Sequence, residues 1–141
     1  LAYPYRTPFA EKKDLVQALL TRLKEGQKIT AVTDHVMTPT FVDDFAECIH
    51  ILMNTGSTGL YHAVGSQAIS PFDLAQLIAK VFDLDPSLIT PTTREEFFKG
   101  RAPRPYNLAL NNDRIKKLGV KMRSVEEGLV ELKRQLENTK F

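Results

Sequence analysis

The sequence has 141 residues, of which 43% are hydrophobic and 26% are charged, ordinary proportions for a globular protein. At this length we expect one domain, large enough to bury roughly two thirds of the surface that its unfolded chain exposes. The formal net charge is +2, and Lys and Arg are scattered among Asp and Glu, so nucleic acid is not an expected partner. No apolar run approaches the ~20 residues that a spanning helix needs, so no membrane association is expected either.

A single cysteine, Cys48, lies within a helical pattern and cannot form an intrachain disulfide. Its expected role is that of a small core residue, and it fits a reducing compartment, so we expect a cytoplasmic location. No signal peptide is recognisable, and the first residue is Leu1 rather than Met. We expect a processed chain or a piece of a longer one.

Apolar spacing and capping residues predict four substantial helices, at about 8–25, 42–54, 70–82 and 124–136. Two shorter helices are predicted at 93–100 and 112–118. Short β-branched or apolar runs predict strands at 29–32, 60–64 and 88–90, with an extended segment at 106–110. The expected class is therefore mixed α/β, mostly helices with a few short strands.

The stretch 38–46, TPTFVDDFA, joins an extended entry to the second helix. Pro39 fixes its own φ and holds the residue before it in an extended conformation. Thr40 is the expected N-cap, and Asp43 is the expected acidic half of a capping box. Asp43 and Asp44 then lie in the first turn, where the helix dipole favours carboxylates, which explains them without a catalytic dyad.

The predicted strand from Leu60 to Val64 is apolar on both faces except for His62, a pattern typical of burial in a larger sheet. The chain offers few other strands to pair with it, and an unpaired apolar edge is a liability. We therefore expect this strand to lie beside a sheet supplied by missing sequence or by another subunit, including a second copy of the chain.

Most motifs for nucleotide or metal chemistry are missing. The three histidines have no partner at a metal-ligand spacing, and with one cysteine a zinc site is not predicted. The sequence contains neither a P-loop nor a G-x-S-x-G elbow. Gly59 precedes a predicted strand rather than joining a strand to a helix, so the glycines do not form a dinucleotide fingerprint.

Two arginines are the more informative cluster. Arg101 and Arg104 lie in a proline-stiffened loop close to Asn107, and they cannot pair with each other. The planar fork of Arg suits phosphate or carboxylate, because it donates two parallel hydrogen bonds. The alternative is that both arginines pair with Glu95, Glu96 or another surface acid.

Three stretches then occur in a distinctive order: TPTFVDDFA at 38–46, GLYH at 59–62 and RPYNLAL at 104–110. In this order they resemble the C-terminal half of extended short-chain dehydrogenases/reductases that act on nucleotide sugars. The most similar branch is that of the dTDP-4-dehydrorhamnose reductases, with sugar-nucleotide epimerases and dehydratases further off. The resemblance covers nearly all of the 141 residues.

The resemblance implies a protein in two halves. An N-terminal Rossmann half would hold NAD(P) and the catalytic Tyr-x-x-x-Lys pair, and residues 1–141 would be the C-terminal substrate-binding domain. The four tyrosines of this chain are followed four residues later by Thr7, Phe9, Gly65 and Leu110, never by Lys. We therefore expect the Rossmann half to be absent from this chain, which alone would bind no NAD(P) and catalyse no hydride transfer.

Among the site residues, the resemblance carries Arg104 over as a candidate contact to the substrate phosphates. Arg101 and Thr40 are further substrate-binding candidates, and no catalytic, cofactor or metal residue is expected. Met37 stands where many epimerases carry an arginine that grips the diphosphate, which points away from that branch.

The function implied is that of the substrate-binding portion of an NAD(P)-dependent nucleotide-sugar reductase or epimerase. The alternative is a non-catalytic regulatory or interaction module on the same scaffold. The residues around Arg104 leave both open, because Leu108, Asn111 and Asp113 depart from the usual reductase pattern.

Overall fold

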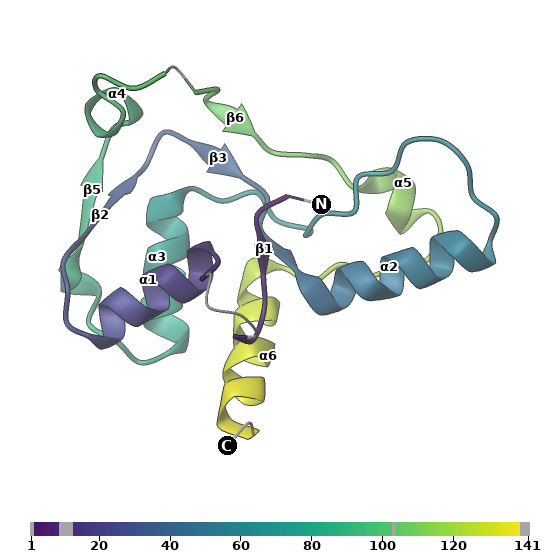
Figure 1. The fold of residues 1–141 in the computed structure, drawn as a ribbon, viewed down its shortest axis with the longest axis horizontal. Coiled ribbons are helices and arrows are strands. Elements are labelled where there is room, and N and C mark those ends of the chain that lie inside the picture. Colours follow the sequence, from purple (N-terminus) through teal and green to yellow (C-terminus); the bar gives the residue numbers. More distant parts are fainter. Residues whose placement is uncertain (1, 9–12, 103, 139–141) are drawn as a thin grey trace.

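A computed structural model describes residues 2–8, 13–102 and 104–138 (Figure 1). In chain order its elements are β1 (Pro4–Tyr5), α1 (Leu15–Lys24), β2 (Ile29–Val32), β3 (Val36–Met37), β4 (Thr40–Phe41), α2 (Val42–Asn54), α3 (Pro71–Val81), a 3-10 turn η1 (Pro86–Leu88), β5 (Ile89–Thr92), α4 (Arg94–Phe97), β6 (Asn107–Leu108), α5 (Asp113–Lys116) and α6 (Val125–Asn138). The mixed α/β class with few short strands is confirmed. None of these helices is long and apolar enough to cross a membrane.

The strands pair in parallel, as β1 with β4, β2 with β5 and β3 with β6. Parallel pairing requires a long connection between partners, so helices lie between paired strands in the sequence. In the longest pair Ile29 lies opposite Ile89 and Val32 opposite Thr92. The pair β3–β6 joins the chain near residue 37 to the segment that follows residue 104, which matters for the site below.

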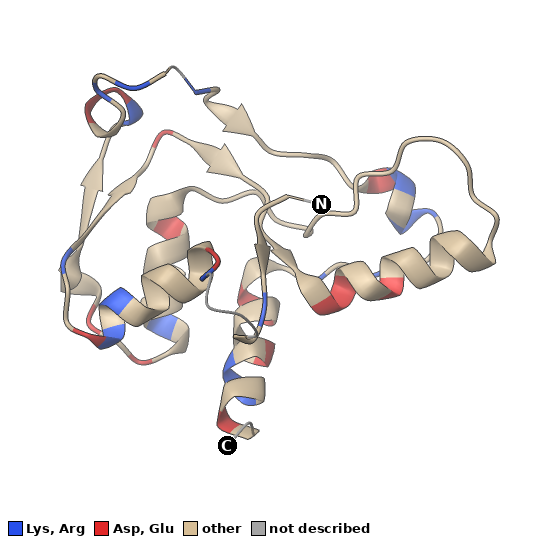
Figure 2. Cartoon of the chain, viewed as in Figure 1, with Lys and Arg blue, Asp and Glu red and all other residues tan. Residues whose placement is uncertain are grey.

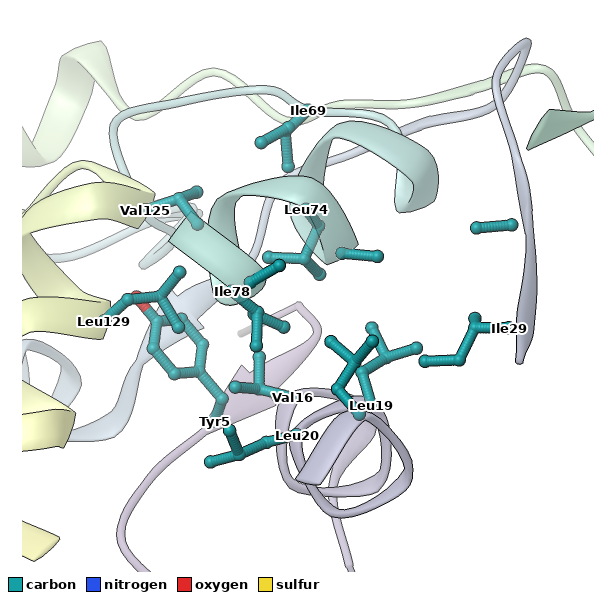
Figure 3. Close-up of a cluster of buried hydrophobic side chains, with 14 of the residues drawn as sticks. Tyr5, Val16, Leu19, Leu20, Ile29, Ile69, Leu74, Ile78, Val125 and Leu129 are labelled. Carbon is teal, nitrogen blue, oxygen red and sulfur yellow. The ribbon is translucent and has the colours of Figure 1, made fainter. Parts of the chain in front are cut away.

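The main core lies where α1, α3 and α6 pack against β1, β2, β4 and β5. Leu74 and Ile78 lie one turn apart on α3 and are fully buried. Figure 3 shows their side chains between those of α1, such as Val16, and those of α6, such as Leu129. A smaller core under α2 and α5 contains Cys48, Ala63, Ile115, Val120 and Met122.

Two predicted helix starts are confirmed, but only the one at Ser124 is a complete capping box, because Asp73 Oδ2 accepts from the Ser70 hydroxyl at 2.6 Å and not from the Ser70 amide. Ser70 Oγ accepts a hydrogen bond from Asp73 N at 3.0 Å, with proline in the first turn of α3. Ser124 Oγ accepts from Glu127 N at 3.2 Å, and Glu127 Oε2 accepts from Ser124 N at 2.8 Å. In both helix starts the capping hydroxyl binds an amide three residues along the chain, so the local sequence was sufficient to place them.

The first helix begins later than predicted. The sequence predicts a start at Pro8, but Pro8 is not helical and α1 begins at Leu15; residues 9–12 lie outside the described part of the chain. Asp14 Oδ1 accepts a hydrogen bond from Gln17 N at 2.8 Å. An aspartate N-cap satisfies one of the free amides of the first turn, which explains the later start.

The predicted cap of α2 is wrong. The N-cap is Phe41, which makes no side-chain capping bond, and Thr40 lies in β4. The Thr40 hydroxyl is used in a tertiary contact instead, since Thr40 Oγ1 accepts a hydrogen bond from Gly65 N at 3.2 Å. Asp43 does not complete a capping box, because its Oδ2 accepts from Gln135 Nε2 on α6 at 2.7 Å.

The predicted strand from Leu60 to Val64 is also wrong, since this stretch is irregular. The expectation that a sheet from missing sequence or another subunit lies beside this stretch stays a prediction. Side chains bind its carbonyls in place of a neighbouring strand. Arg114 Nη1 donates to Leu60 O at 2.5 Å, and Asn112 Nδ2 donates to Val64 O at 3.0 Å and to Gly65 O at 3.2 Å.

The contact between α6 and β1 generates a stability prediction. A Cβ at Gly128 would lie 2.0 Å from Tyr5 Oη, so Gly128→Ala cannot fit without a shift of the buried Tyr5. Helix propensity favours Ala over Gly by about 1 kcal/mol, and overpacking costs about 1–3 kcal/mol. We expect a net loss of stability in urea unfolding, and a smaller loss when Tyr5→Phe removes the hydroxyl. Val130→Ala on the exposed side of α6 is the control, and equal stability of Gly128→Ala and wild type would contradict the packing.

Candidate functional site

Three segments that are distant in sequence meet at one point, here called the motif junction and formed by Thr38, Pro39, Thr40, Gly65, Leu110 and Asn112. Thr38 Oγ1 accepts a hydrogen bond from Leu110 N at 3.1 Å. Thr40 Oγ1 accepts from Gly65 N, as described above, and donates to Ala2 O at 2.8 Å. Asn112 adds the two bonds to the carbonyls before and at Gly65. The polar side chains of the junction are buried and all are hydrogen-bonded, so the junction is a rigid element.

Gly65 is required at the motif junction for a steric reason. A Cβ at this position would lie 2.1 Å from the backbone oxygen of Pro39, closer than real Cβ contacts allow. The close approach of two backbone segments therefore depends on a residue without a side chain.

Beyond the motif junction, the loop that follows α4 carries Arg104 and Tyr106, and the chain then runs parallel to β3 as β6. Thr93 Oγ1 accepts from Glu96 N at 3.4 Å and caps α4, as predicted. Arg94 N donates to Asp34 Oδ1 at 2.7 Å, which ties the start of α4 to the turn between β2 and β3. The Cζ atom of Arg94 lies 3.7 Å from the ring centroid of Tyr106, and that of Arg104 lies 4.8 Å from the centroid of Phe98. These two cation–π contacts fasten the loop to α4.

A pocket of about 330 Å³ lies between α1, β2 and α4, and Arg104 is part of its wall. Its lining is mainly apolar, and consists of Tyr3, Leu15, Ala18, Leu19, Arg22, residues 29–32, His35, Met37, Pro71, Phe97, Phe98 and Arg104. His35 is only 6% exposed, and its Nδ1 has no hydrogen-bond partner among the described residues. A mainly apolar pocket with a cation and a buried imidazole in its wall is the usual form of a small-molecule site.

Neither Arg101 nor Arg104 pairs with a carboxylate in the part of the chain that the structure describes, so the alternative of pairing with Glu95 or Glu96 is not observed. Figure 2 shows Lys and Arg along the loop that follows α4, beside the acidic residues of that helix. Both arginines are exposed, and of the two only Arg104 lines the pocket. The backbone N of Arg101 donates to Phe98 O at 2.9 Å.

Thr40 lies apart from this pocket. Its side chain is 0% exposed, and its hydroxyl already acts as both donor and acceptor in the motif junction. The structure therefore gives Thr40 a role in positioning the chain around the site, and brings only Arg104 of the three candidate residues to the pocket wall.

Asp43 and Asp44 do not form a dyad, because they face different partners. Asp43 is exposed and bonds to Gln135, whereas Asp44 is buried and pairs with the guanidinium of Arg123. Asp44 Oδ2 also accepts a hydrogen bond from Arg123 N at 2.7 Å. Burial raises the pKa of the Asp44 carboxyl above its usual value, and the bonds from Arg123 oppose that rise.

A second pocket, of about 320 Å³, lies on the other side of the motif junction. It is lined by Thr38, residues 65–68, residues 109–113 and Lys116. Its wall contains one acid, Asp113, and one base, Lys116, whereas the wall of the Arg104 pocket contains arginines and no acid from the described segments. Within the described ranges no group of three or more His, Cys, Asp and Glu is placed to hold a metal ion.

Sequence reasoning missed three residues near the Arg104 pocket. The sequence places Arg94 and Phe98 in the predicted helix at 93–100 without a functional role, and it predicts no ligand or catalytic role for His35. The spacing of Arg94 and Phe98 at i and i+4 on a predicted helix was available as a signal, because it places both on one face. Their pairing with the loop depends on tertiary structure.

Several known proteins are similar to this chain. Residues 5–138 match the family described as "RmlD substrate binding domain". A probable dTDP-4,6-dihydroxy-2-methyloxan-3-one 4-ketoreductase of Streptomyces antibioticus is 31% identical over 109 residues, which are 77% of this chain and 37% of that protein. A methionine adenosyltransferase 2 subunit beta of Xenopus tropicalis is 30% identical over 91 residues, which are 61% of this chain and 27% of that protein.

Solved structures share the fold. The dTDP-4-dehydrorhamnose reductase of Bacillus anthracis in complex with NADP superposes with a TM-score of 0.81 at 26% identity, covering 94% of this chain and 46% of that one. A dTDP-glucose 4,6-dehydratase of the same organism has a TM-score of 0.74 at 18% identity, covering 98% of this chain and 43% of that one, and shows the fold alone. The chain thus spans less than half the length of these relatives.

The close contact at the motif junction predicts that Gly65→Ala is strongly destabilising. The added methyl group would meet the Pro39 carbonyl, a backbone atom that cannot move without disturbing the junction. We expect a loss of about 1–3 kcal/mol or more in urea unfolding. Ser66→Ala, at the exposed neighbouring position, should stay within about 0.5 kcal/mol of wild type. A Gly65→Ala protein as stable as Ser66→Ala would show that the two segments do not approach so closely.

The Asp44–Arg123 pair predicts a pH-dependent loss of stability. Arg123→Met leaves the buried carboxylate without its guanidinium, which should cost about 1–3 kcal/mol at neutral pH. Because the pKa of Asp44 is raised in the folded state, the folded protein binds this proton more readily than the unfolded chain. The deficit should therefore shrink as the pH falls from about 7 toward about 4, because protonation of the carboxyl removes the buried charge.

Urea unfolding at both pH values measures this deficit. Arg134→Met is the control, since Arg134 pairs with Glu131 on the exposed face of α6 and should change little. A deficit for Arg123→Met that is the same at both pH values would rule out Asp44 as its cause.

Proposed function

Because the chain belongs to the RmlD substrate binding domain family, we propose that it is the substrate-binding portion of an NAD(P)-dependent nucleotide-sugar reductase that acts on a dTDP-sugar. The proposal is supported by relatives named as a dTDP-sugar ketoreductase and as dTDP-4-dehydrorhamnose reductases. An epimerase is less favoured, since a UDP-glucose 4-epimerase structure that shares the fold is only 13% identical.

The observation that carries the proposal is the mainly apolar pocket with the unpaired Arg104 in its wall. The flat base and sugar of a nucleoside suit a lining of aromatic and aliphatic side chains, such as Phe97 and Leu15. The phosphates attached to that nucleoside require cations with directional donors, which Arg104 supplies. His35 offers the pocket one buried polar group for orienting a ligand.

In this proposal the chain forms only one wall of the reaction site. NAD(P) and the catalytic Tyr-x-x-x-Lys pair would come from a Rossmann half, and the B. anthracis structure with NADP is about twice as long as this chain, which supports such a division. Residues 1–141 are then the substrate-binding domain, and the cytoplasmic location expected from the sequence stays a prediction.

A second candidate is a non-catalytic subunit of a larger enzyme. One relative is named as a subunit of methionine adenosyltransferase, so this family is also present in a protein named as part of an assembly. In that case the Arg104 pocket need not discriminate between nucleotides.

Calorimetric titration with dTDP and with thymidine tests the proposal. We expect dTDP to bind more tightly than thymidine, because only dTDP carries the phosphates that Arg104 contacts. Arg104→Ala should weaken dTDP binding by about tenfold or more, as expected for a charge-assisted contact, and leave thymidine binding unchanged. Arg134→Ala, at an arginine already paired on α6, is the control.

If the folded chain binds dTDP no better than thymidine, or if Arg104→Ala binds dTDP as wild type does, the reductase-like site is contradicted. A folded chain that binds neither compound would favour the subunit.

A further inference from the structure

Arg94 is a buried charged residue. Its side chain is 7% exposed, and its Nε has no hydrogen-bond partner among the described residues. Nor does any carboxylate in the described ranges form an ion pair with its guanidinium. A buried guanidinium without a counter-charge is costly, so an anion is expected to meet it when the protein works.

The position of Arg94 relates it to Arg104. Arg94 and Phe98 lie one turn apart at α4, and Phe98 N donates to Arg94 O at 2.9 Å. Arg104 precedes Pro105, which favours an extended conformation at Arg104, and in an extended chain residues two apart, such as Arg104 and Tyr106, are expected on one side. The observed stacks join Arg94 to Tyr106 and Phe98 to Arg104.

These four side chains therefore form two crossed pairs, with an arginine and an aromatic ring contributed by each segment. Residues one helical turn apart, or two apart in an extended chain, are separated by roughly 5–7 Å. The two guanidinium groups consequently lie on neighbouring pairs, and nothing in the described part of the chain neutralises either. Two like charges held near each other by stacking favour an anion that can contact both.

The stacking contacts involve the flat face of each guanidinium and not its N–H edge. An aromatic ring covers the flat face of the guanidinium, whereas the N–H groups point outward in its plane. Tyr106 is itself 65% exposed, so the stack that holds Arg94 lies at the surface of the loop. Arg104 is exposed and can donate a pair of parallel hydrogen bonds to one phosphate group. Arg94 is 7% exposed and can donate only from the edge of its guanidinium that the ring leaves uncovered.

We propose that Arg94 is a second phosphate-binding residue, and that Arg94 and Arg104 together bind the two phosphates of a diphosphate group. That the ligand is a nucleoside diphosphate rests on the proposed function. The diphosphate site itself rests only on the two stacked, unpaired arginines.

Inorganic pyrophosphate is the probe, because it has the two phosphates and lacks the nucleoside. Calorimetric titration at constant ionic strength should show binding to the wild-type chain that is tighter than that of orthophosphate. Arg94→Met and Arg104→Met should each weaken pyrophosphate binding by about tenfold or more, and the double variant should bind more weakly than either single variant, because each arginine contacts one of the two phosphates. Arg134→Met on α6 is the matched control and should bind as wild type does.

Since Arg94 is buried, Arg94→Lys is a second variant that keeps the charge but not the planar fork. Circular dichroism confirms folding before titration. Arg94→Lys should retain part of the affinity that Arg94→Met loses, whereas a purely structural role for Arg94 would change the unfolding midpoint and leave pyrophosphate affinity unchanged in every folded variant.

The outcomes separate this inference from the proposed function. Absence of pyrophosphate binding to wild type, or equal pyrophosphate affinity in wild type and Arg94→Met, overturns the inference. If dTDP binding requires Arg104 but not Arg94, the proposed function stands and the inference fails. If pyrophosphate needs both arginines but dTDP binds no more tightly than pyrophosphate, the diphosphate site stands and the nucleotide function fails.

Discussion

The structure depends on one close contact, the approach of the Gly65 backbone to the Pro39 carbonyl. Only a residue without a Cβ fits there, and the hydroxyl of Thr40 completes the contact by accepting the Gly65 amide. On the other side of Pro39, the hydroxyl of Thr38 accepts a hydrogen bond from the amide of Leu110. One proline-stiffened segment thereby fixes two others, and the one that ends at Leu110 carries Arg104 to the pocket.

The buried carboxylate of Asp44 and the two arginines Arg94 and Arg104 differ in their partners. Asp44 is buried, but it is met by the backbone and the guanidinium of Arg123, so it belongs to the framework beneath α2. Arg94 and Arg104 are held by aromatic rings, which position a cation without neutralising it. Cations held in this way can meet the phosphates of a ligand.

Features that depend on residues close together in the sequence could be predicted, whereas those that depend on distant residues could not. The starts at Ser70 and Ser124 use side chains three residues from the amides that they bind, so the local pattern was sufficient. Thr40 has the residue type of an N-cap, but its hydroxyl is engaged by Gly65, and no local pattern reveals that competition. The apolar stretch from Leu60 failed as a strand for the same reason, because distant side chains bind its carbonyls.

The site shows the same limit. Arg104 could be found because it lies in a recognisable motif, while Arg94 could not, because its importance arises from burial and from a ring twelve residues away. A crystal structure of the chain with dTDP bound would test the central claim most directly. The expected result is a diphosphate within hydrogen-bonding distance of the Arg104 guanidinium, with the thymidine against the apolar walls of α1 and β2. A dTDP molecule in the pocket beside Lys116, or one whose phosphates contact no arginine of the loop or of α4, would contradict it.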